Sequence, residues 1–439
     1  MKIISADYVL PISAEPIMDG ALAIDGGKIA AVGPRDDIVP QYPEAGHENF
    51  GKAAILPGFV NCHSHLEITA FRSALDDVEH DFRSWLLKLN DLRAKMSDAE
   101  IEAAAVLGAM EGARAGVTCF GDIGRYGKAG FEALKKAGLR GVLFQETEFS
   151  PDSRTADEDI EYLKEKFFAL RETATHLVEI GLSPHSPYTV SARLFEKIAE
   201  FAAAENIKII IHAAESADEN ALLMDGAGFF VEVYKKFGLE WNSPRCSSLE
   251  FLERTGILRV KPLLAHCVTV SDTDIELIRA SGSSIAHCPK SNAKFGHGYA
   301  PFEKFLDAGI STGLGSDSVA SNNLCDLLEE SRFAALAARN LPGRKRFISA
   351  KEALEAATLG GAKALGLDHK IGTLEPGKQA DIAIVSLTNI AQQPINEIHA
   401  ALVFSSNGRD VMRTFVAGAE IFKATNFLEH AISPVNGLL

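Results

Sequence analysis

The strongest constraint in this 439-residue sequence is a series of eight short apolar runs, each followed by a stretch with apolar residues at helical spacing. The runs occupy 55–62, 117–124, 141–149, 178–184, 208–215, 261–268, 283–289 and 310–317. Segments such as 98–115, 191–205 and 271–280 have the amphipathic pattern of helices. Eight strand–helix units predict an α/β fold whose middle is a (β/α)8 TIM barrel. A doubly wound sheet is the alternative, although no glycine-rich phosphate loop follows the first strand.

The two ends of the chain have a different texture, in which β-prone runs are separated by Gly and Asp turns. The D-G-G step at 25–27 lies between two such runs and predicts a tight hairpin. Similar runs return at 380–387 and 411–423. The two ends are therefore expected to build one small β-sandwich domain. The predicted division is a sandwich of residues 1–53 and 368–439 around a barrel of residues 54–367.

Composition limits the partners and the compartment. Apolar residues make up 46% and charged residues 23%, as in an ordinary globular protein. A formal net charge of −15 argues against nucleic acid or an anionic membrane as a partner, which leaves a small-molecule substrate. The six cysteines form no CxxC pair, which indicates reduced thiols, and no run is long and apolar enough for a membrane span. We expect a cytoplasmic protein.

Histidines follow several of the apolar runs. His63 and His65 form an H-x-H pair, and residues two apart on a strand point to the same face, so both imidazoles can reach one metal ion. Two surface histidines on a loop are the alternative. His212 ends another run and lies three residues before Glu215, whose carboxylate could carry a proton. Taken alone, His212 would be a buried core histidine.

Two further ionisable residues end apolar runs, where an unpaired polar side chain is costly. Asp317 is a natural hard-oxygen ligand and a potential base, whereas His266 is either a fifth ligand or a hydrogen-bond partner of a water molecule. Because the carboxyl ends of barrel strands converge on one face, these residues can surround the same ion. The sequence predicts one divalent metal ion, with zinc preferred and iron as an alternative.

The remaining histidines carry weaker signals. His287, in IAHCPKSN, is at least as consistent with packing in the core or pocket wall as with catalysis. Six others have polar or turn-like neighbours and are predicted to lie on the surface: His47, His80, His297, His369, His399 and His430.

Seven stretches resemble the amidohydrolase superfamily, in its cytosine deaminase, chlorohydrolase and nucleoside deaminase branch. They are LPGFVNCHSHLE, SPHSPYTVS, HAAE, LLAHC, AHCPKSN, GLGSDSVASNN and GTLEPGKQADIAIV. They occur in family order and span nearly the whole chain. The resemblance implies a (β/α)8 barrel flanked by a β-sandwich, and one metal held by His63, His65, His212 and Asp317. It also implies that Glu215 and His266 are catalytic, and that the protein is a homodimer or larger.

The resemblance also implies a mechanism. Members with two metals place a carboxylated lysine after the fourth strand, but VEIGLSPHSPY has none, so we expect a mononuclear site. A bound ion lowers the pKa of water towards about 7. Asp317 and His266 would take its proton, and Glu215 would protonate a ring nitrogen beside the carbon under attack and then the departing amine.

The same motifs narrow the range of expected substrates. The His-x-x-Glu pair favours an amidine-like carbon bearing an amino group, and SPHSPYTVS resembles members acting on adenosine-type nucleosides. His185 is then either a wall of the substrate pocket or a structural residue. The segment F-x-x-W-L at 82–86 resembles a lid helix, in which Arg83 and Ser84 replace a glutamate that grips ribose. The predicted substrate-binding residues are His185, Arg83, Trp85, Ser291 and Asn292.

Aminodeoxyfutalosine, an intermediate of menaquinone synthesis, and methylthioadenosine-type nucleosides are the favoured substrates. Arg72 or Arg83 could meet the benzoate carboxylate of aminodeoxyfutalosine. Glu146 and Glu148 occupy positions where some relatives acting on adenosylhomocysteine have arginine, which counts against that substrate. The alternatives are a chlorohydrolase or cyclic amide hydrolase acting on a triazine or pyrimidine ring, and, more remotely, a non-catalytic barrel.

Overall fold

Eight parallel strands form the centre of the molecule in the computed structural model, which describes residues 1–424. Four form one sheet in chain order: β6 (Phe59–Ser64), β7 (Val117–Gly124), β8 (Arg140–Glu146) and β9 (Val178–Ser183). Four form a second: β10 (Ile210–Ala213), β11 (Leu263–His266), β12 (Ser284–His287) and β13 (Thr312–Leu314). Isolated parallel bridges connect the two sheets, Leu182 to Ile209 and Ser64 to Asp317. The sequential strand order differs from the reversal that defines a doubly wound sheet.

All eight apolar runs contain a central strand, but the first run also contributes to a second sheet. The chain breaks at Gly58 into β5 (Ala53–Pro57) and β6. A Cβ atom at Gly58 would lie 2.1 Å from the side chain of Thr118, so the close approach requires glycine. The amide of Gly58 donates to the carbonyl of Asp381 at 2.9 Å. The run therefore passes from one sheet into the other.

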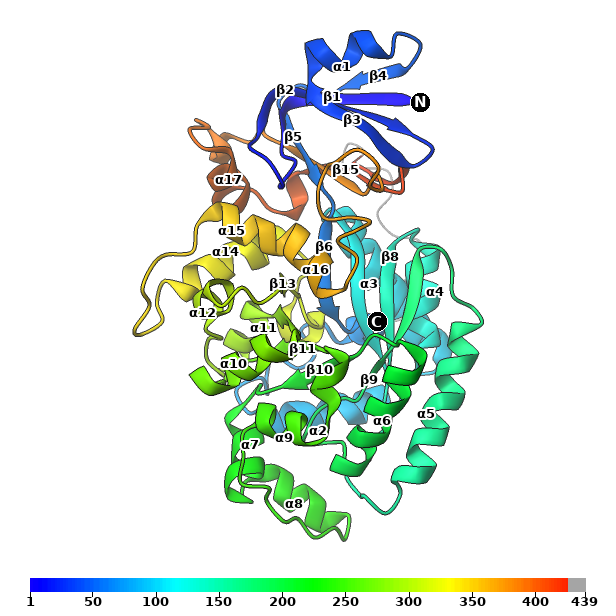
Figure 1. Cartoon of the computed structure of the whole chain (residues 1–439), viewed down its shortest axis with the longest axis vertical. Helices are drawn as coiled ribbons and strands as arrows, with labels where there is room; N and C mark the ends of the chain where they lie inside the picture. The colour runs from blue at the N-terminus through cyan, green and yellow to red at the C-terminus, as the bar shows by residue number, and fades with distance from the viewer. Residues whose placement is uncertain (425–439) are drawn as a thin grey trace.

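Both ends of the chain contribute to a single eight-stranded sheet, which lies at one end of the molecule (Figure 1). Its other strands are β1 (Lys2–Val9), β2 (Ile17–Asp25), β3 (Lys28–Pro34), β4 (Gly46–Asn49), β14 (Ile382–Ser386), β15 (Val411–Val416) and β16 (Ala419–Lys423). The order is β16-β15-β14-β5-β1-β2-β3, with β4 beside β1. Gly26 and Gly27 connect β2 and β3 with φ of 55° and 80°, as a tight hairpin requires.

The helices follow the strands as the periodicity predicts. They are α1 (Arg35–Gln41), α2 (Phe82–Arg93), α3 (Asp98–Arg114), α4 (Lys128–Lys136), α5 (Ala156–Arg171), α6 (Ala192–Glu205), α7 (Ala217–Asn220), α8 (Phe229–Lys236), α9 (Ser248–Arg254), α10 (Asp272–Ser281), α11 (Pro289–Lys294), α12 (Phe302–Asp307), α13 (Val319–Asn322), α14 (Leu327–Ala338), α15 (Ala350–Glu355), α16 (Gly361–Ala364) and α17 (Ile398–Ala400). Ser97, Ser191 and Ser271 cap the three predicted helices. Helices α2, α7, α8 and α9 lie at the end opposite the terminal sheet (Figure 1).

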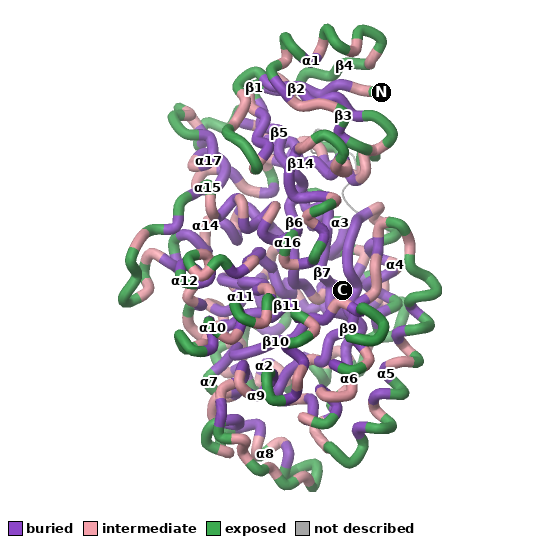
Figure 2. Tube along the Cα trace, viewed as in Figure 1, coloured by how far each residue is buried: buried purple, intermediate pink, exposed green. Residues whose placement is uncertain are grey.

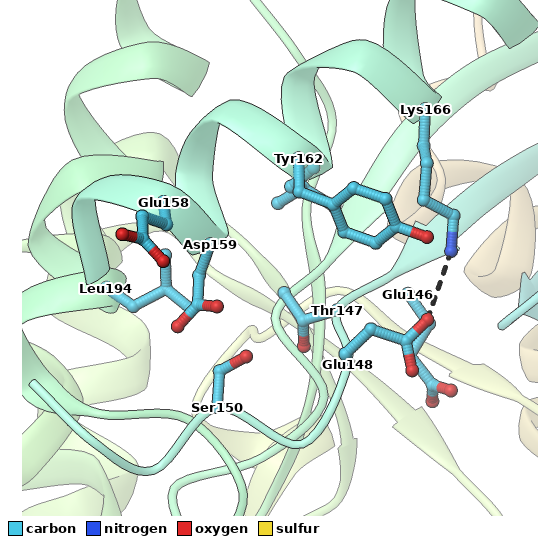
Figure 3. A pocket seen from close by; sticks show the side chains of 10 residues that line it. Glu146, Thr147, Glu148, Ser150, Glu158, Asp159, Tyr162, Lys166 and Leu194 are labelled. Carbon is cyan, nitrogen blue, oxygen red and sulfur yellow. Dashed lines mark hydrogen bonds and ion pairs between the residues drawn. The ribbon is translucent and has the colours of Figure 1, made fainter. Parts of the chain in front are cut away.

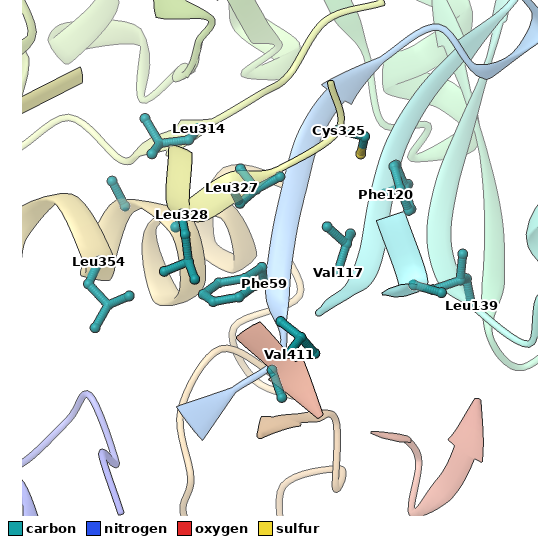
Figure 4. Packing of buried hydrophobic residues seen from close by; sticks show 14 of the residues in the cluster. Phe59, Val117, Phe120, Leu139, Leu314, Cys325, Leu327, Leu328, Leu354 and Val411 are labelled. Carbon is teal, nitrogen blue, oxygen red and sulfur yellow. The ribbon is translucent and has the colours of Figure 1, made fainter. Parts of the chain in front are cut away.

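The core is continuous between the central strands and the terminal sheet. Phe59, Val117 and Phe120 pack with Leu327 and Val411, which brings β6, β7, α14 and β15 into one cluster (Figure 4). The central strands are buried along their length, whereas the outer helices expose one face (Figure 2). Within residues 1–424, no helix has the length and hydropathy needed to cross a membrane. All six cysteines are buried free thiols.

The histidines predicted to lie on the surface do not all lie there. His399 is buried at 8% exposure, so its prediction is wrong. Helix α17 packs against α15, and the His399 ring lies 2.6 Å from Glu397 at the start of the helix. His430 and the last part of the predicted sandwich domain lie outside the described residues. His47, His80 and His369 are exposed, as predicted.

One buried ion pair connects the central and terminal sheets, and we expect its loss to be costly. Arg140 in β8 donates to Asp381 through Nε and Nη2, at 2.8 and 3.0 Å, and both residues are 3% exposed. Removing one partner would leave a buried charge without compensation. Asp381→Ala should lower the free energy of unfolding by about 3 kcal/mol or more in urea denaturation. Asp307→Ala, which breaks an exposed pair with Arg346, should cost less than about 1 kcal/mol.

Candidate metal centre and active site

Three histidines from two distant parts of the chain meet at the carboxyl ends of the central strands. His63 lies in β6, His65 follows that strand, and His212 lies in β10. The Nε2 atoms of His65 and His212 are 3.2 Å apart, and the His63 ring lies 5.0 and 4.9 Å from their rings. The H-x-H pair is therefore not a surface pair: His63 is fully buried.

Asp317 and His266 complete the cluster. Asp317 Oδ1 lies 3.5 Å from Nε2 of His63 and 3.6 Å from Nε2 of His65. The His266 ring is 5.3 Å from the ring of His63. His266 and Asp317 have φ of 72° and 55°, in the left-handed region that non-glycine residues rarely adopt. Such strained backbone concentrates at functional sites, where the surrounding structure holds it.

The chemistry of this donor set fits a divalent metal ion. Two overlapping groups have ligand atoms within 4.8 Å of one another: His63, His65 and His212, and His63, His266 and Asp317. Both ring nitrogens of His63 are buried with no hydrogen-bond partner among the described residues, which is costly unless something else binds them. Burial lowers the pKa of His63 to about 4 and that of His65 well below its usual value, so both rings are neutral, as ligation requires.

A layer of neighbouring polar groups fixes the orientation of the cluster. The hydroxyls of Ser291 and Ser321 donate to Asp317 Oδ2 at 2.6 and 3.0 Å. Nδ1 of His266 lies 2.8 Å from Asn292 Oδ1, and Nδ1 of His212 lies 2.9 Å from a backbone carbonyl. Because each Nδ1 donates its hydrogen to one of these oxygens, Nε2 of each ring keeps its lone pair.

Asp122 is a residue of this layer that the sequence analysis missed. It lies at the end of β7 and is fully buried. Its Oδ1 accepts hydrogen bonds from the Ser64 hydroxyl and the Leu66 amide, both at 2.8 Å. Asp122 therefore holds the segment that carries His63 and His65. An aspartate inside the apolar run VTCFGDIG was the available signal, because a carboxylate in a buried strand needs partners.

Glu215 lies beside the histidine cluster in a buried position. Its Oε1 is 3.7 Å from Nε2 of His266, and its Oε2 accepts a hydrogen bond from the Tyr188 hydroxyl at 3.1 Å. Burial raises the pKa of Glu215 to about 7. The carboxylate of Glu219 accepts a hydrogen bond from the backbone amide of Glu215 at 2.8 Å and so fixes the segment that carries Glu215. A carboxyl group with this pKa can both give and take a proton near neutral pH.

His297 also belongs to this site, so its predicted surface location is wrong. Its side chain is only 7% exposed and its Nε2 lies 3.9 Å from Glu215 Oε1. The ring packs against Phe82 of α2 and Phe295, with centroids 4.8 and 5.2 Å away. Helix α11 ends at Lys294, and the chain after it turns back over the site. Polar neighbours in the sequence gave no sign of that turn.

The predicted substrate-binding residues occupy different positions around the cluster. His185 stands next to His212, with ring centroids 4.6 Å apart, and is partly exposed. Trp85 is buried against Phe295, at 4.9 Å between ring centroids. Arg83 stacks on Phe229 at 4.6 Å and lies 3.8 Å from Glu232.

The other residues considered from the sequence are each engaged by neighbouring protein groups. Arg72 pairs with Glu111. Ser291 and Asn292 have no exposed surface and contact Asp317 and His266. His287 is buried and stacks on Phe302 at 5.0 Å, as expected of a wall residue.

A histidine–aspartate cluster at the carboxyl ends of parallel strands, with a buried glutamic acid beside it, is typical of metal-dependent hydrolases. The chain belongs to the Amidohydrolase family, whose sequence pattern matches residues 54–421. The predicted superfamily and the prediction of a hydrolase acting on non-peptide C–N bonds are thereby confirmed.

Relatives and solved structures agree with this family over nearly the whole chain. The chain is 32% identical to the 5-methylthioadenosine/S-adenosylhomocysteine deaminase of Pelotomaculum thermopropionicum, over 93% of this chain and 90% of that protein. An adenosine deaminase from Xanthomonas campestris with bound zinc superposes with a TM-score of 0.83 at 28% identity, covering 95% and 92% of the two chains. Helicobacter pylori aminofutalosine deaminase, in complex with methylthio-coformycin, has a TM-score of 0.81 at 24% identity, covering 96% and 100%. That last likeness shows the fold alone.

Proposed function

We propose that this chain is a zinc-dependent hydrolytic deaminase of aminopurine nucleosides that carry a modified 5′ position. The observation that carries the proposal is the placement of Glu215, buried 3.7 Å from His266 at the edge of a histidine–aspartate cluster. Relatives named as methylthioadenosine and adenosylhomocysteine deaminases support the substrate class. Aminodeoxyfutalosine and methylthioadenosine-type nucleosides are the favoured members, and the former connects the enzyme to menaquinone synthesis.

In this proposal His63, His65, His212 and Asp317 hold one divalent ion. When bound, the ion acts as a Lewis acid that makes water nucleophilic near neutral pH. Asp317 takes a proton from the attacking water while His266 orients it. Glu215 gives its proton to the ring nitrogen beside the amino-bearing carbon, which makes that carbon more electrophilic. As the carbonyl forms, Glu215 takes the hydroxyl proton and passes it to the amine, which leaves as ammonia. The proton held by Asp317 then restores Glu215 to its acid form.

Asn292 acts in this scheme as a positioning residue, together with Ser291, because its side chain touches His266 and has no exposed surface. Asn292→Ala should lower kcat about 10- to 100-fold, since the tautomer and orientation of His266 are no longer fixed. Asn292→Asp keeps an acceptor oxygen and should recover much of that loss. Steady-state kinetics at matched metal content measures both effects. Equal kcat values for the two variants would contradict this role.

The proposed function is tested by identifying the leaving group that the enzyme releases from each substrate. Purified enzyme is given aminodeoxyfutalosine, methylthioadenosine, adenosine, adenosylhomocysteine and atrazine, and ammonia and chloride are measured separately. Ammonia from a 5′-modified nucleoside at the highest kcat/KM is the expected result. Chloride from atrazine without ammonia from any nucleoside would instead indicate a chlorohydrolase.

The finer architectural predictions are part of the proposal. Closure of the eight parallel strands into one barrel is supported by the parallel bridges at Leu182–Ile209 and Ser64–Asp317. A terminal β-sandwich domain is supported by the sheet shared between the two chain ends, to which residues 53–57 also belong. The exact domain limits, the homodimer, the cytoplasmic location and the lack of a nucleic-acid partner stay predictions.

A further inference from the structure

The site contains one histidine that the proposed mechanism does not use. His297 lies in the chain segment after α11, and its side chain is only 7% exposed. Its Nε2 atom is buried and has no hydrogen-bond partner within residues 1–424. A buried polar atom in this position lowers stability unless a ligand supplies the partner. The ring of His297 is therefore available to a bound molecule.

Aromatic packing fixes the direction of the His297 ring. Phe82 lies at 87° to it with ring centroids 4.8 Å apart, and Phe295 lies at 34° with centroids 5.2 Å apart. Trp85 packs on Phe295 in the same wall, and its Nε1 is likewise buried without a partner among the described residues. Burial lowers the pKa of His297 to about 4, so the ring is neutral near neutral pH. Two unsatisfied polar atoms in one wall indicate a side of the site that a ligand completes.

The buried Nε2 atom of His297 faces the carboxyl group of Glu215. It lies 3.9 Å from Oε1, and Nε2 of His266 lies 3.7 Å from the same oxygen. The other oxygen, Oε2, already accepts the hydrogen bond from Tyr188. A separation of 3.9 Å is too long for a hydrogen bond, but one atom placed about 3 Å from each group lies within hydrogen-bond distance of both. Glu215 and His297 can therefore contact the same substrate atom.

Glu215 differs in its surroundings from Glu148, which follows a neighbouring central strand. Lys166 lies 3.3 Å from Glu148 (Figure 3) and Arg125 lies 2.6 Å from it, while Arg93 lines the same cavity of about 380 Å3. Within residues 1–424, Glu215 pairs with no lysine or arginine. A nearby cation favours the charged form of a carboxyl group, so the surroundings of Glu215 let it hold the proton that it gives to the substrate.

From this arrangement we infer that His297 accepts a hydrogen bond from the departing amine and so raises the basicity of its nitrogen. The inference rests on the proposed function and adds a catalytic residue to it. After water has attacked, the carbon bears a hydroxyl and an amino group, and the amino nitrogen lies between Oε1 of Glu215 and Nε2 of His297.

The proposed role of His297 fits the proton transfers of the reaction. One N–H of the amine donates to Nε2, with the ring hydrogen on Nδ1, and electron density on the nitrogen increases. The nitrogen lone pair takes the proton that Glu215 received from the hydroxyl group. The C–N bond then breaks, its electron pair stays with the nitrogen, and ammonia leaves as the carbonyl forms. His297 itself neither gains nor loses a proton.

The test compares two substitutions that keep different parts of the side chain. His297→Phe keeps the aromatic packing and removes the acceptor, whereas His297→Gln can place an amide oxygen near the position of Nε2. The substrate is the best one among methylthioadenosine, adenosine and aminodeoxyfutalosine. His297→Phe should lower kcat for ammonia release about tenfold with KM nearly unchanged, because the hydrogen bond strengthens in the transition state. His297→Gln should recover a large part of that loss at matched metal content.

A substrate without amino hydrogens separates this role from a structural one. In the analogue with chlorine in place of the amino group, water attacks the same carbon but the leaving group has no hydrogen to donate to Nε2. Chloride release and the Kd of this analogue, measured by calorimetry, should therefore be nearly equal for the wild-type protein and His297→Phe. Equal losses of ammonia release and chloride release would mean that His297 only packs, and would overturn the inference.

His80→Phe is the matched control, since it makes the same exchange at an exposed histidine and should leave ammonia release unchanged. Equal kcat values for the wild-type protein and His297→Phe would overturn the inference and leave the proposed function standing. If the wild-type protein released no ammonia from any of the nucleosides, the proposed function would fail instead, and the inference with it.

Discussion

Glu215→Gln should reduce deamination by about 10²- to 10⁴-fold, the usual contribution of a general acid–base group, while the metal content stays near one ion per chain. The amide has the size of the carboxyl group and can still receive the Tyr188 hydrogen bond. It has no acidic proton for the ring nitrogen and cannot accept one for the departing amine. Steady-state kinetics combined with metal analysis of the same sample measures the effect.

Two controls make this result specific to Glu215. Glu232→Gln removes a carboxylate that lies near Arg83 at the surface and should leave kcat unchanged. The Kd of a nucleoside substrate for Glu215→Gln, measured by calorimetry, should stay within a few-fold of the wild-type value, which shows that the pocket is intact. Normal turnover in Glu215→Gln would remove this residue from the mechanism.

The histidine–aspartate cluster was predictable because its members follow strand ends. His63, His212 and His266 each end or follow an apolar run, and parallel strands place their carboxyl ends at the same side of the fold. Residues far apart in the sequence can therefore be neighbours in the fold, since the strand order alone brings Asp317 next to His63. The same regularity made the positions of the central strands predictable from apolar runs.

The rest of the site depends on loops, which have no periodicity to read. His297 reaches Glu215 because the chain turns after α11, and nothing in its polar surroundings indicates the direction of that turn. Arg93 and Arg125 come together only because α2 covers the strand ends. The break of the first run at Gly58 was also missed, because a buried strand that ends one sheet and a strand that begins the next have the same composition.

Removing the metal should abolish turnover entirely, and zinc should restore it. The ion would bind the folded chain through residues from β6, β10 and the loop after β13, which are not together in the unfolded chain. Binding to the native state alone stabilises it by about 4 kcal/mol at a free metal concentration a thousand times the Kd. Dialysis against a chelator should therefore also lower the thermal unfolding midpoint, and scanning calorimetry before and after zinc addition measures the shift.

His63→Ala should have the same effect permanently, because His63 is the ligand shared by both groups of the cluster. We expect the variant to purify with much less than one ion per chain and to show no measurable turnover after zinc addition. His369→Asn, an exchange at an exposed histidine, should keep both metal and activity. If wild-type protein held no stoichiometric ion and kept its turnover in chelator, the side chains of the cluster would need another explanation. The buried nitrogens of His63, which have no hydrogen-bond partner within residues 1–424, would then lower stability without serving a function.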